Sequence, residues 1–380
     1  MEAERTDEKD NEPRPLITSL GLAIIDDIHF GDGSSVTYLL GGSGSFCTAG
    51  ARLFCDGPKS RAVAWVLHAG HDFPPALEFE LSTWQIDLTL RKTQEVRSTR
   101  GHMIYADGTS GCKFEFSICS RSYANILTDK RCEYKMPVLQ VLPRHLHGSR
   151  TLKSKALHFL ASPTALLSQM EELEQLHASS NKEQEQSTQL IIWEPAPLSC
   201  RPEHLVSCFE AARKVDVFSP NHIELQAFFG ISAKPFNATI VETLATAFLA
   251  SGVGKSGDGI ILVRAGEHGS LLNRYGTPPY WQQPYYRHDL GTAHPRIVDT
   301  TGTGNAFLGG FAVGLDETND HLEAMRYGTV AASFMIEQIG LPTLTVNEQF
   351  GTELWNGDRP RRRLEMLKAR DEQLVIEIDD

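Results

Sequence analysis

The apolar positions of this chain form short runs that are separated by longer segments with helical spacing. Each run is rich in large or β-branched residues, which favours buried strands. The runs cover residues 17–25, 62–67, 156–160, 190–193, 215–218 and 259–263. Helices are expected from near residue 163, at 203–213 and at 238–250. Strands that alternate with helices predict an α/β fold, with a doubly wound, mostly parallel sheet flanked by helices.

One stretch has a different pattern of residue types. Residues 91–120 alternate threonine, arginine and aromatic side chains around Gly101, Gly108 and Gly111, as a β-meander with tight turns does. Together with residues 28–40 they are expected to form a small β lid outside the main sheet. Such a lid can close over a substrate.

The two ends of the chain differ from its centre. Residues 1–15 are charged and contain proline, so a disordered tail is expected before one α/β domain at 16–349. Residues 350–380 form a C-terminal extension with four arginines, Arg359, Arg361, Arg362 and Arg363. The basic run is short and is followed by acids, which favours a solvated extension docked on the body over a site for an anionic partner.

Composition narrows the range of partners. The 380 residues are 41% hydrophobic, as in an ordinary globular protein, and the net charge of −12 disfavours attraction to nucleic acid or to an anionic membrane. The sequence contains no apolar run as long as a membrane span needs. Its N-terminus also lacks the basic segment followed by an apolar segment that is typical of a secretory signal. The seven cysteines are scattered without zinc-site spacing, which indicates reduced thiols. A cytoplasmic protein that binds small molecules or other proteins is expected.

Candidate chemistry follows the first apolar run. Asp26 and Asp27 come directly after it, and ligands of open parallel sheets bind beyond the carboxyl ends of the strands. The alternative for these acids is a solvated turn. Further along the chain, Gly41 and Gly42 open a glycine-rich turn at 39–45, where backbone can approach a ligand closely.

The most informative segment is residues 297–311, Ile-Val-Asp-Thr-Thr-Gly-Thr-Gly-Asn-Ala-Phe-Leu-Gly-Gly-Phe. Its Gly302-Thr303-Gly304 turn leads into an apolar, helix-compatible stretch that begins at Asn305. The start of a helix has unpaired backbone N–H groups and the positive end of the helix dipole. The segment therefore predicts an anion hole for a phosphate oxygen.

This segment resembles the second signature of the PfkB carbohydrate kinases, D-T-x-G-A-G-D. Thr303 stands in the alanine position, and the matching residues are Asp299, Thr300, Gly302 and Gly304. Further matches follow the family's order between residues 17 and 342. They are Asp26 or Asp27, Gly41-Gly42, Asn221-x-x-Glu224, Gly266-x-x-Gly269 and the small-residue helix 324–332. The resemblance implies a ribokinase-like fold and ATP-dependent transfer of a phosphoryl group to a hydroxyl of a sugar or nucleoside-like small molecule.

A narrower resemblance points to one branch of the family. Residues 49–54, Trp193-Glu194-Pro195, residues 220–225 and the Gly304-Asn305 pair are similar to the fungal Mak-thirty-two-like proteins.

The resemblance also implies roles for individual residues. Gly302, Thr303 and Gly304 would supply amides to the phosphoryl group, and Asp26, Asp27, Gly41 and Gly42 would bind the acceptor. ATP with Mg²⁺ would bind at Asn221, Glu224, Arg264, Gly266, Gly269, Asp299 and Thr300, with Glu224 reaching the metal through water. A helix capping box is the alternative for Asn221 and Glu224. Several relatives dimerise through their lid strands, so a homodimer through the lid is the oligomer that the resemblance implies.

Two positions depart from the family's pattern. Asn305 replaces the aspartate that takes the acceptor's proton, and an amide can bind a hydroxyl but cannot accept its proton at neutral pH. Phe46 stands where ribokinase-like members often place a sugar-binding asparagine. Two hypotheses follow: a kinase that works without the usual base, or a pseudokinase that binds nucleotide or sugar and acts through protein contacts.

Overall fold

The computed structural model describes residues 13–105, 133–134, 138–179, 189–287, 294–347, 349 and 351–379. Most of the tail predicted at 1–15 therefore lies outside the described residues. Within the described part, the carbonyl oxygen of Pro15 accepts a hydrogen bond from the N–H of Lys155 at 2.8 Å, and Arg14 Nε donates to the carbonyl oxygen of Lys153. The chain thus joins the body at residue 14.

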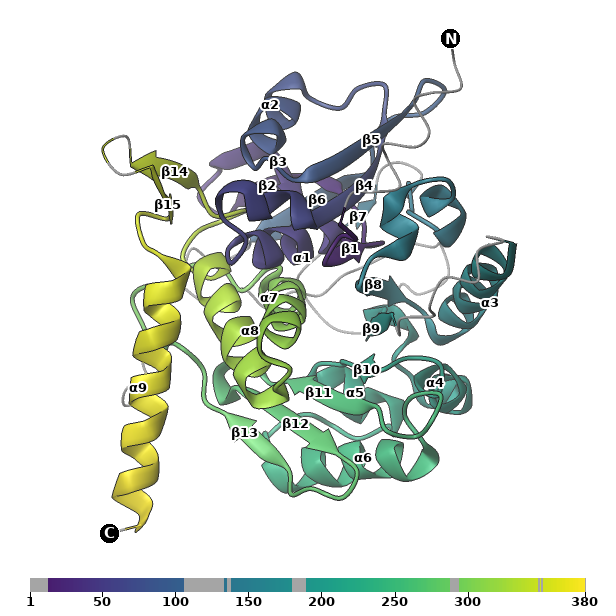
Figure 1. Ribbon diagram of the computed structural model, residues 1–380, viewed down its shortest axis with the longest axis vertical. Coiled ribbons are helices and arrows are strands. Elements are labelled where there is room, and N and C mark those ends of the chain that lie inside the picture. Colours follow the sequence, from purple (N-terminus) through teal and green to yellow (C-terminus); the bar gives the residue numbers. More distant parts are fainter. Residues whose placement is uncertain are drawn as a thin grey trace.

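The central sheet confirms the predicted α/β fold (Figure 1). Its nine strands lie in the order β13-β12-β11-β10-β9-β8-β1-β4-β5. Neighbouring strands from β11 to β5 are parallel, whereas β12 and β13 pair antiparallel at one edge. The strands are β1 (Ile17–Ser19), β4 (Val63–Gly70), β5 (Asp87–Thr93), β8 (Ala156–Ala161), β9 (Leu190–Pro195), β10 (Val217–Phe218), β11 (Ile260–Arg264), β12 (Ser270–Arg274) and β13 (Tyr280–Gln282).

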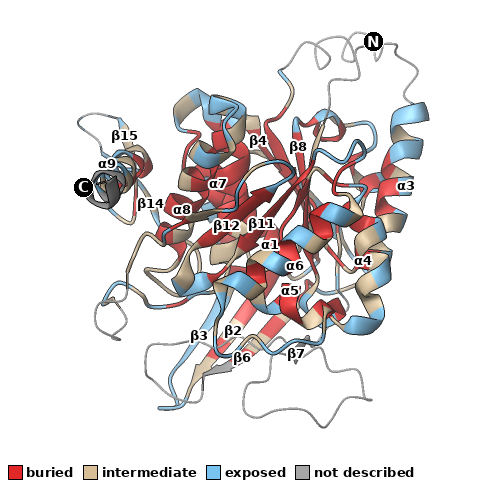
Figure 2. Cartoon of the chain, turned by 90° about the horizontal axis from the view of Figure 1, so that it is seen from below, coloured by how far each residue is buried: buried red, intermediate tan, exposed pale blue. Residues whose placement is uncertain are grey.

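Helices cover both faces of this sheet, because successive strand side chains point to opposite sides. In β11, for example, Leu262 packs into one core and Val263 into the other. The first core also contains α1 (Ser43–Arg52), α2 (Pro75–Thr83), α7 (Thr303–Thr318) and α8 (His321–Met335). The second contains α3 (Pro163–Ser179), α4 (Leu205–Ala212), α5 (His222–Phe228) and α6 (Ala238–Ser251). Figure 2 shows the buried strands between these two helical layers.

A smaller four-stranded sheet projects from the body (Figure 2). Its order is β3-β2-β6-β7, with β2 (Ile24–Phe30), β3 (Ser35–Gly41), β6 (Arg100–Tyr105) and β7 (Glu133–Tyr134). Of the lid range predicted at 91–120, residues 91–93 belong to β5 of the main sheet, residues 100–105 form β6, and residues 106–120 lie outside the described residues.

The apolar run at 17–25 is not one strand, and this corrects the sequence prediction. Strand β1 ends at Ser19, and β2 begins at Ile24 in the smaller sheet. The chain bends between them at Gly21, where a Cβ atom would overlap with the backbone of Gly44. Asp26 and Asp27 consequently lie inside a lid strand and not at the carboxyl end of a central strand.

The C-terminal extension docks on the first core. It begins with β15 (Thr352–Trp355), which pairs with β14 (Leu344–Asn347) at the end of the preceding domain, and continues as α9 (Pro360–Asp379), which runs along the side of the molecule (Figure 1). The buried Arg52 forms an ion pair with Glu353 at 2.6 Å, and Trp355 packs edge-on against Trp84.

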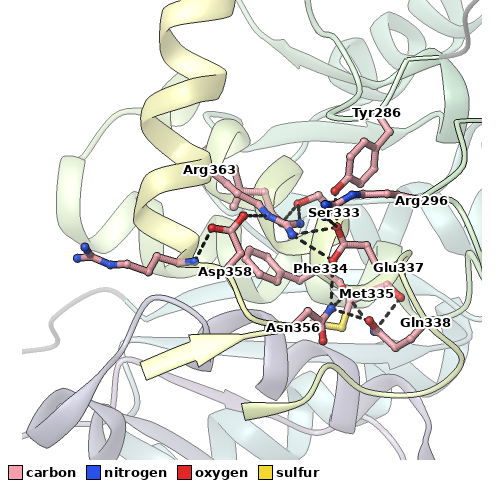
Figure 3. Close-up of polar contacts among 12 residues, drawn as sticks. Tyr286, Arg296, Ser333, Phe334, Met335, Glu337, Gln338, Asn356, Asp358 and Arg363 are labelled. Atoms are coloured by element: carbon pink, nitrogen blue, oxygen red, sulfur yellow. Dashed lines mark hydrogen bonds and ion pairs between the residues drawn. The ribbon is translucent and has the colours of Figure 1, made fainter. Parts of the chain in front are cut away.

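Arg363 fixes the first turn of α9 to the body (Figure 3). Its guanidinium donates to both carboxylate oxygens of Glu337 at 2.9 and 3.1 Å, to Asp358 at 2.9 Å and to Ser333 at 3.1 Å. Arg361 binds Glu317 in a similar bidentate way. These two arginines therefore hold the extension in place.

Two further observations concern the described part of the chain. None of its helices is long and apolar enough to cross a lipid bilayer. Four of the cysteines, Cys47, Cys55, Cys200 and Cys208, are buried free thiols, and the other three lie outside the described residues.

Several short 3₁₀ turns link these elements. They cover Gly57–Ala62, Pro143–Leu146, Arg150–Lys153, Pro197–Ser199, Pro202–His204 and Gly266–His268.

Candidate active site

A chain of buried polar side chains crosses the centre of the main sheet. Ser19 at the end of β1 lies 2.8 Å from Nδ1 of His158 on β8, and Nε2 of His158 lies 2.6 Å from Glu194 on β9. All three side chains are fully or almost fully buried. Buried polar groups of this kind persist only when they are paired, so the row forms one connected network.

Glu194 is the centre of this network. Its carboxylate receives hydrogen bonds from His158 and from Nδ2 of Asn305 at 2.8 Å, and it forms an ion pair with Nη1 of Arg264 at 2.6 Å. Burial would raise the pKa of Glu194, but Arg264, His158 and Asn305 together lower it to about 2. Glu194 is therefore a permanently charged acceptor.

His158 carries the matching positive charge. Burial would lower the pKa of its imidazole, but the neighbouring Cys47 and Glu194 raise it to about 10. In the imidazolium form both ring nitrogens donate, one to Ser19 and one to Glu194. The pair His158 and Glu194 is thus buried as two ions that neutralise each other.

The predicted anion hole lies at the start of α7. Gly302 precedes the helix in the left-handed conformation, at φ +70°, which favours glycine. A Cβ atom at Gly302 would overlap with the ring of Phe46, and a Cβ atom at Gly304 would overlap with Nη1 of Arg264. The two glycines therefore admit one aromatic ring and one guanidinium to the turn. Thr303 donates its hydroxyl to the carbonyl oxygen of Thr300 at 2.8 Å, which tightens the same turn.

Asp299 shapes the entry to this turn. Its buried Oδ1 accepts hydrogen bonds from the backbone N–H of Thr301 at 2.9 Å and from the Thr301 hydroxyl at 2.6 Å. Its own N–H donates to the carbonyl oxygen of Ile336. These contacts place Asp299 and Thr300 beside the predicted anion hole, and their binding of nucleotide also stays a prediction.

Asp26 lies in β2, at the part of the site that is predicted to bind the acceptor. Its carboxylate fits between Gly41 and Gly101, where a Cβ atom on either glycine would overlap with it. Burial, together with the nearby charges of Asp27 and Asp299, raises the pKa of Asp26 to about 7. With Phe46, Asp299 and Thr301, Asp26 lines a cavity of about 10 Å³, the room that one water molecule needs.

The other predicted acceptor residues have local structural contacts. Asp27 is half-buried and accepts a hydrogen bond from the backbone N–H of Tyr38 at 3.1 Å. Gly42 precedes α1 at φ +92°, where a Cβ atom would overlap with the carbonyl oxygen of Leu22. The structure thus brings Asp26, Gly41 and Phe46 to the cavity and places Asp27 in the β2–β3 ladder.

Asn221 and Glu224 form a complete capping box at the start of α5. Oδ1 of Asn221 accepts the N–H groups of Ile223 and Glu224 at 2.9 and 2.8 Å, and Oε2 of Glu224 accepts the N–H of Asn221 at 2.8 Å. The same Oε2 lies 3.7 Å from Nη2 of Arg264. Burial dominates over Arg264 and raises the pKa of Glu224 to about 7.

This donor set does not fit the magnesium ion that the family resemblance implies. Mg²⁺ requires oxygen ligands, above all ionised carboxylates. Here Oδ1 of Asn221 and Oε2 of Glu224 accept backbone N–H groups, and a guanidinium lies beside Glu224. A divalent cation at this position would lie next to the positive charge of Arg264 and would be repelled by it.

Gly266 and Gly269 form the turn between β11 and β12. Their φ angles of +60° and +88° favour glycine, and the N–H of Ala265 donates to the carbonyl oxygen of Gly269 at 2.8 Å. A Cβ atom at Gly269 would overlap with the backbone of Gln282. The hairpin needs these glycines, and their contact with a nucleotide stays a prediction.

The sequence analysis missed Ser19, His158 and Glu194 as site residues. Glu194 does fall within Trp193-Glu194-Pro195, a segment on which the resemblance to the fungal branch rests. His158 gives no such signal, because a lone histidine in an apolar strand reads as an ordinary core residue.

A family model for the pfkB family carbohydrate kinases matches residues 14–345. The chain belongs to this family. An uncharacterized protein of Schizosaccharomyces pombe is 28% identical to it over 352 residues, which cover 90% of both chains. The protein MAK32 of Saccharomyces cerevisiae is 28% identical over 345 residues, which cover 88% of both chains, and this confirms the resemblance to the Mak-thirty-two-like branch.

Solved structures agree on the fold of this pfkB-family chain. The ribokinase from Giardia lamblia aligns with a TM-score of 0.61 and 18% identity, over 87% of this chain and 95% of its own. The adenosine kinase from Schistosoma mansoni aligns with a TM-score of 0.62 and 11% identity, over 90% of this chain and 100% of its own. The ribokinase-like fold is therefore confirmed.

Proposed function

We propose that this pfkB-family chain is a pseudokinase, which binds the phosphates of a nucleoside triphosphate such as ATP at the start of α7 and acts through contacts with other proteins. The observation that carries the proposal is the hydrogen bond from Nδ2 of Asn305 to the buried carboxylate of Glu194, at 2.8 Å. It ties the residue at the family's base position into a structural network.

A general base is missing from this position for two reasons. The Asn305 amide cannot accept a proton at neutral pH. Glu194, which lies behind it, is buried with a pKa of about 2 and is already held by three donors. A base works best when its pKa lies near the working pH, so Glu194 is a poor substitute.

The acceptor side supports the same proposal. Phe46 is almost fully buried and packs on Gly302, at the position where ribokinase-like relatives often carry a sugar-binding asparagine. The cavity that the described residues form between Phe46 and Asp26 has room for about one water molecule.

The test exchanges the two side chains of the key hydrogen bond. Asn305→Asp alone would place two carboxylates in contact, whereas the double variant Asn305→Asp/Glu194→Gln keeps one carboxylate and one amide and puts the base at the family's position. We expect wild type and the double variant to bind ATP in calorimetry and to transfer no phosphate to a panel of sugars and nucleosides. Transfer by the double variant would show that an acceptor site is intact and would contradict the pseudokinase proposal.

A second candidate is slow phosphoryl transfer to a hydroxyl of a sugar or nucleoside-like small molecule. It is favoured by Asp26, whose pKa of about 7 suits a general base and whose carboxylate lines the cavity. Any transfer by the wild type should then be lost in Asp26→Asn, with ATP binding unchanged. Transfer that persists in Asp26→Asn would contradict this candidate.

The remaining proposals concern the chain as a whole. We assign residues 16–349 to the family domain and 350–380 to the extension, and we expect the protein to bind its small-molecule ligands in the cytoplasm, away from nucleic acid and membranes. A homodimer through the lid is supported by Val36 and Tyr38, which are 39% and 56% exposed on β3. Sedimentation of wild type and of Tyr38→Asp would test the dimer, because a charge at the interface should shift the sample to monomer.

A further inference from the structure

We propose that Arg264 supplies the positive charge at the phosphate site, so that this chain binds the phosphates of a nucleoside triphosphate without a divalent metal ion. The inference rests on the nucleotide binding proposed above and adds the identity of the cation. The metal-dependent arrangement that the family resemblance implies would be replaced by a side chain of the protein itself.

The position of Arg264 is the first argument. It is the last residue of β11, and its guanidinium reaches the first turn of α7, where only a glycine at 304 leaves room for Nη1. Guanidinium groups bind phosphate through charge-assisted hydrogen bonds, and the start of a helix attracts the same ligand. The guanidinium of Arg264 and the first turn of α7 thus lie in contact, and both attract a phosphate.

The second argument is the hydrogen bonding of the guanidinium. Nη1 pairs with Glu194 at 2.6 Å, and Nη2 donates to the carbonyl oxygen of Ser219 at 2.8 Å. Among the described residues, Nε of Arg264 is buried with no hydrogen-bond partner. The side chain is 14% exposed. Arg264 is therefore held in place while part of its donor capacity stays unused.

The third argument is the balance of charge. Glu194 lies between two cations, the His158 imidazolium and the Arg264 guanidinium, at 2.6 Å from each. Glu224 lies farther from Arg264, at 3.7 Å, and its Oε2 accepts the N–H of Asn221. Glu194 and Oε2 of Glu224 are thus already engaged, and His158 and Arg264 place two positive charges around the single carboxylate of Glu194, beside the start of α7.

The experiment is calorimetry of the full chain with ATP, once with Mg²⁺ and once with EDTA. We expect wild type to bind ATP with equal affinity, within about threefold, in both buffers. Arg264→Met should bind at least about tenfold more weakly in EDTA, since it loses a charge-assisted contact. Arg264→Lys should retain part of the affinity. The matched control is Arg274→Met, at the exposed end of the neighbouring strand β12, which should bind as wild type does.

A loss of folding in Arg264→Met would confuse this result, because Glu194 would lose its ion pair. The double variant Arg264→Met/Glu194→Gln removes both charges, and its fold can be checked by thermal unfolding. If this folded double variant bound ATP in EDTA as tightly as wild type, the proposal would be wrong. Wild-type binding that required Mg²⁺ would also overturn it while leaving nucleotide binding intact. Absence of wild-type binding in both buffers would overturn the proposed function as well.

Discussion

Two arginines of this molecule, the partly buried Arg264 and the fully buried Arg363, differ in how completely their donors are used. Arg363 donates through Nε, Nη1 and Nη2 to Asp358, Ser333 and Glu337, and its guanidinium lies 3.8 Å from the centre of the Phe334 ring (Figure 3). Arg264 uses Nη1 and Nη2 and leaves Nε without a partner among the described residues. Arg363 is surrounded by its partners and is structural, whereas Arg264 keeps an unpaired Nε and lies beside a helix start, the location at which we propose that phosphate binds.

The largest expected effect concerns the structural arginine. Arg363→Met should lower the free energy of unfolding by about 3 to 5 kcal/mol, because the carboxylates of Glu337 and Asp358 would lose their buried guanidinium partner. Urea unfolding would measure this change. The folded variant should bind ATP as wild type does. If it did not, Arg363 and Arg264 would not differ in their roles as described above.

Two carboxylates show a similar contrast in pKa. Cations around Glu194 lower its pKa, whereas burial and neighbouring acids raise the pKa of Asp26. Asp26 ionises near pH 7 in the folded protein and near pH 4 in the unfolded chain, so the folded state holds the extra proton between these values. Its contribution to stability should therefore decline by about 2 to 4 kcal/mol as the pH rises from 4 to 8. Asp26→Asn should remove this decline, as urea unfolding across the pH range would show. Equal slopes for the two proteins would contradict the raised pKa.

The hydrogen bond between Asn305 and Glu194 allows a sharper test within the site. Asn305→Asp should lower stability by about 1 to 3 kcal/mol near pH 7, because two carboxylates in contact at a buried site cannot both ionise. The matched double variant Asn305→Asp/Glu194→Gln should recover most of the loss. A double variant as unstable as the single one would mean that the network depends on more than this pair.

The smallest expected effect comes from Arg362, an exposed arginine of α9, the helix that also carries Arg363. The side chain of Arg362 is 63% exposed and pairs with Asp358 one turn away. Arg362→Met should change the free energy of unfolding by less than about 0.5 kcal/mol, as exposed ion pairs contribute little. A larger change, in the same urea experiment, would show that Asp358 needs both arginines.

Local sequence determined much of this fold. The apolar runs at 62–67, 156–160, 190–193 and 259–263 each lie within or overlap a strand of the main sheet, and the turn at Gly302 and Gly304 opens a helix as expected. The hydrophobic period, the length of an apolar run and the positions of glycines are local properties, so they can be recognised without knowing what packs against the segment. The two departures from the family's pattern, Asn305 and Phe46, were visible for the same reason.

Only the tertiary structure decided how the site is connected. Ser19, His158 and Glu194 are separated by 139 and 36 positions along the chain, and parallel pairing of β1, β8 and β9 brings their side chains into hydrogen-bond contact. Strand pairing also places Asp26 and Asp27 in a lid strand. The contacts of the folded chain likewise distinguish Arg363, whose guanidinium nitrogens are all paired, from Arg264, whose Nε has no partner among the described residues. Such facts depend on which strands become neighbours, and this is set by the packing of the whole domain and not by any one segment.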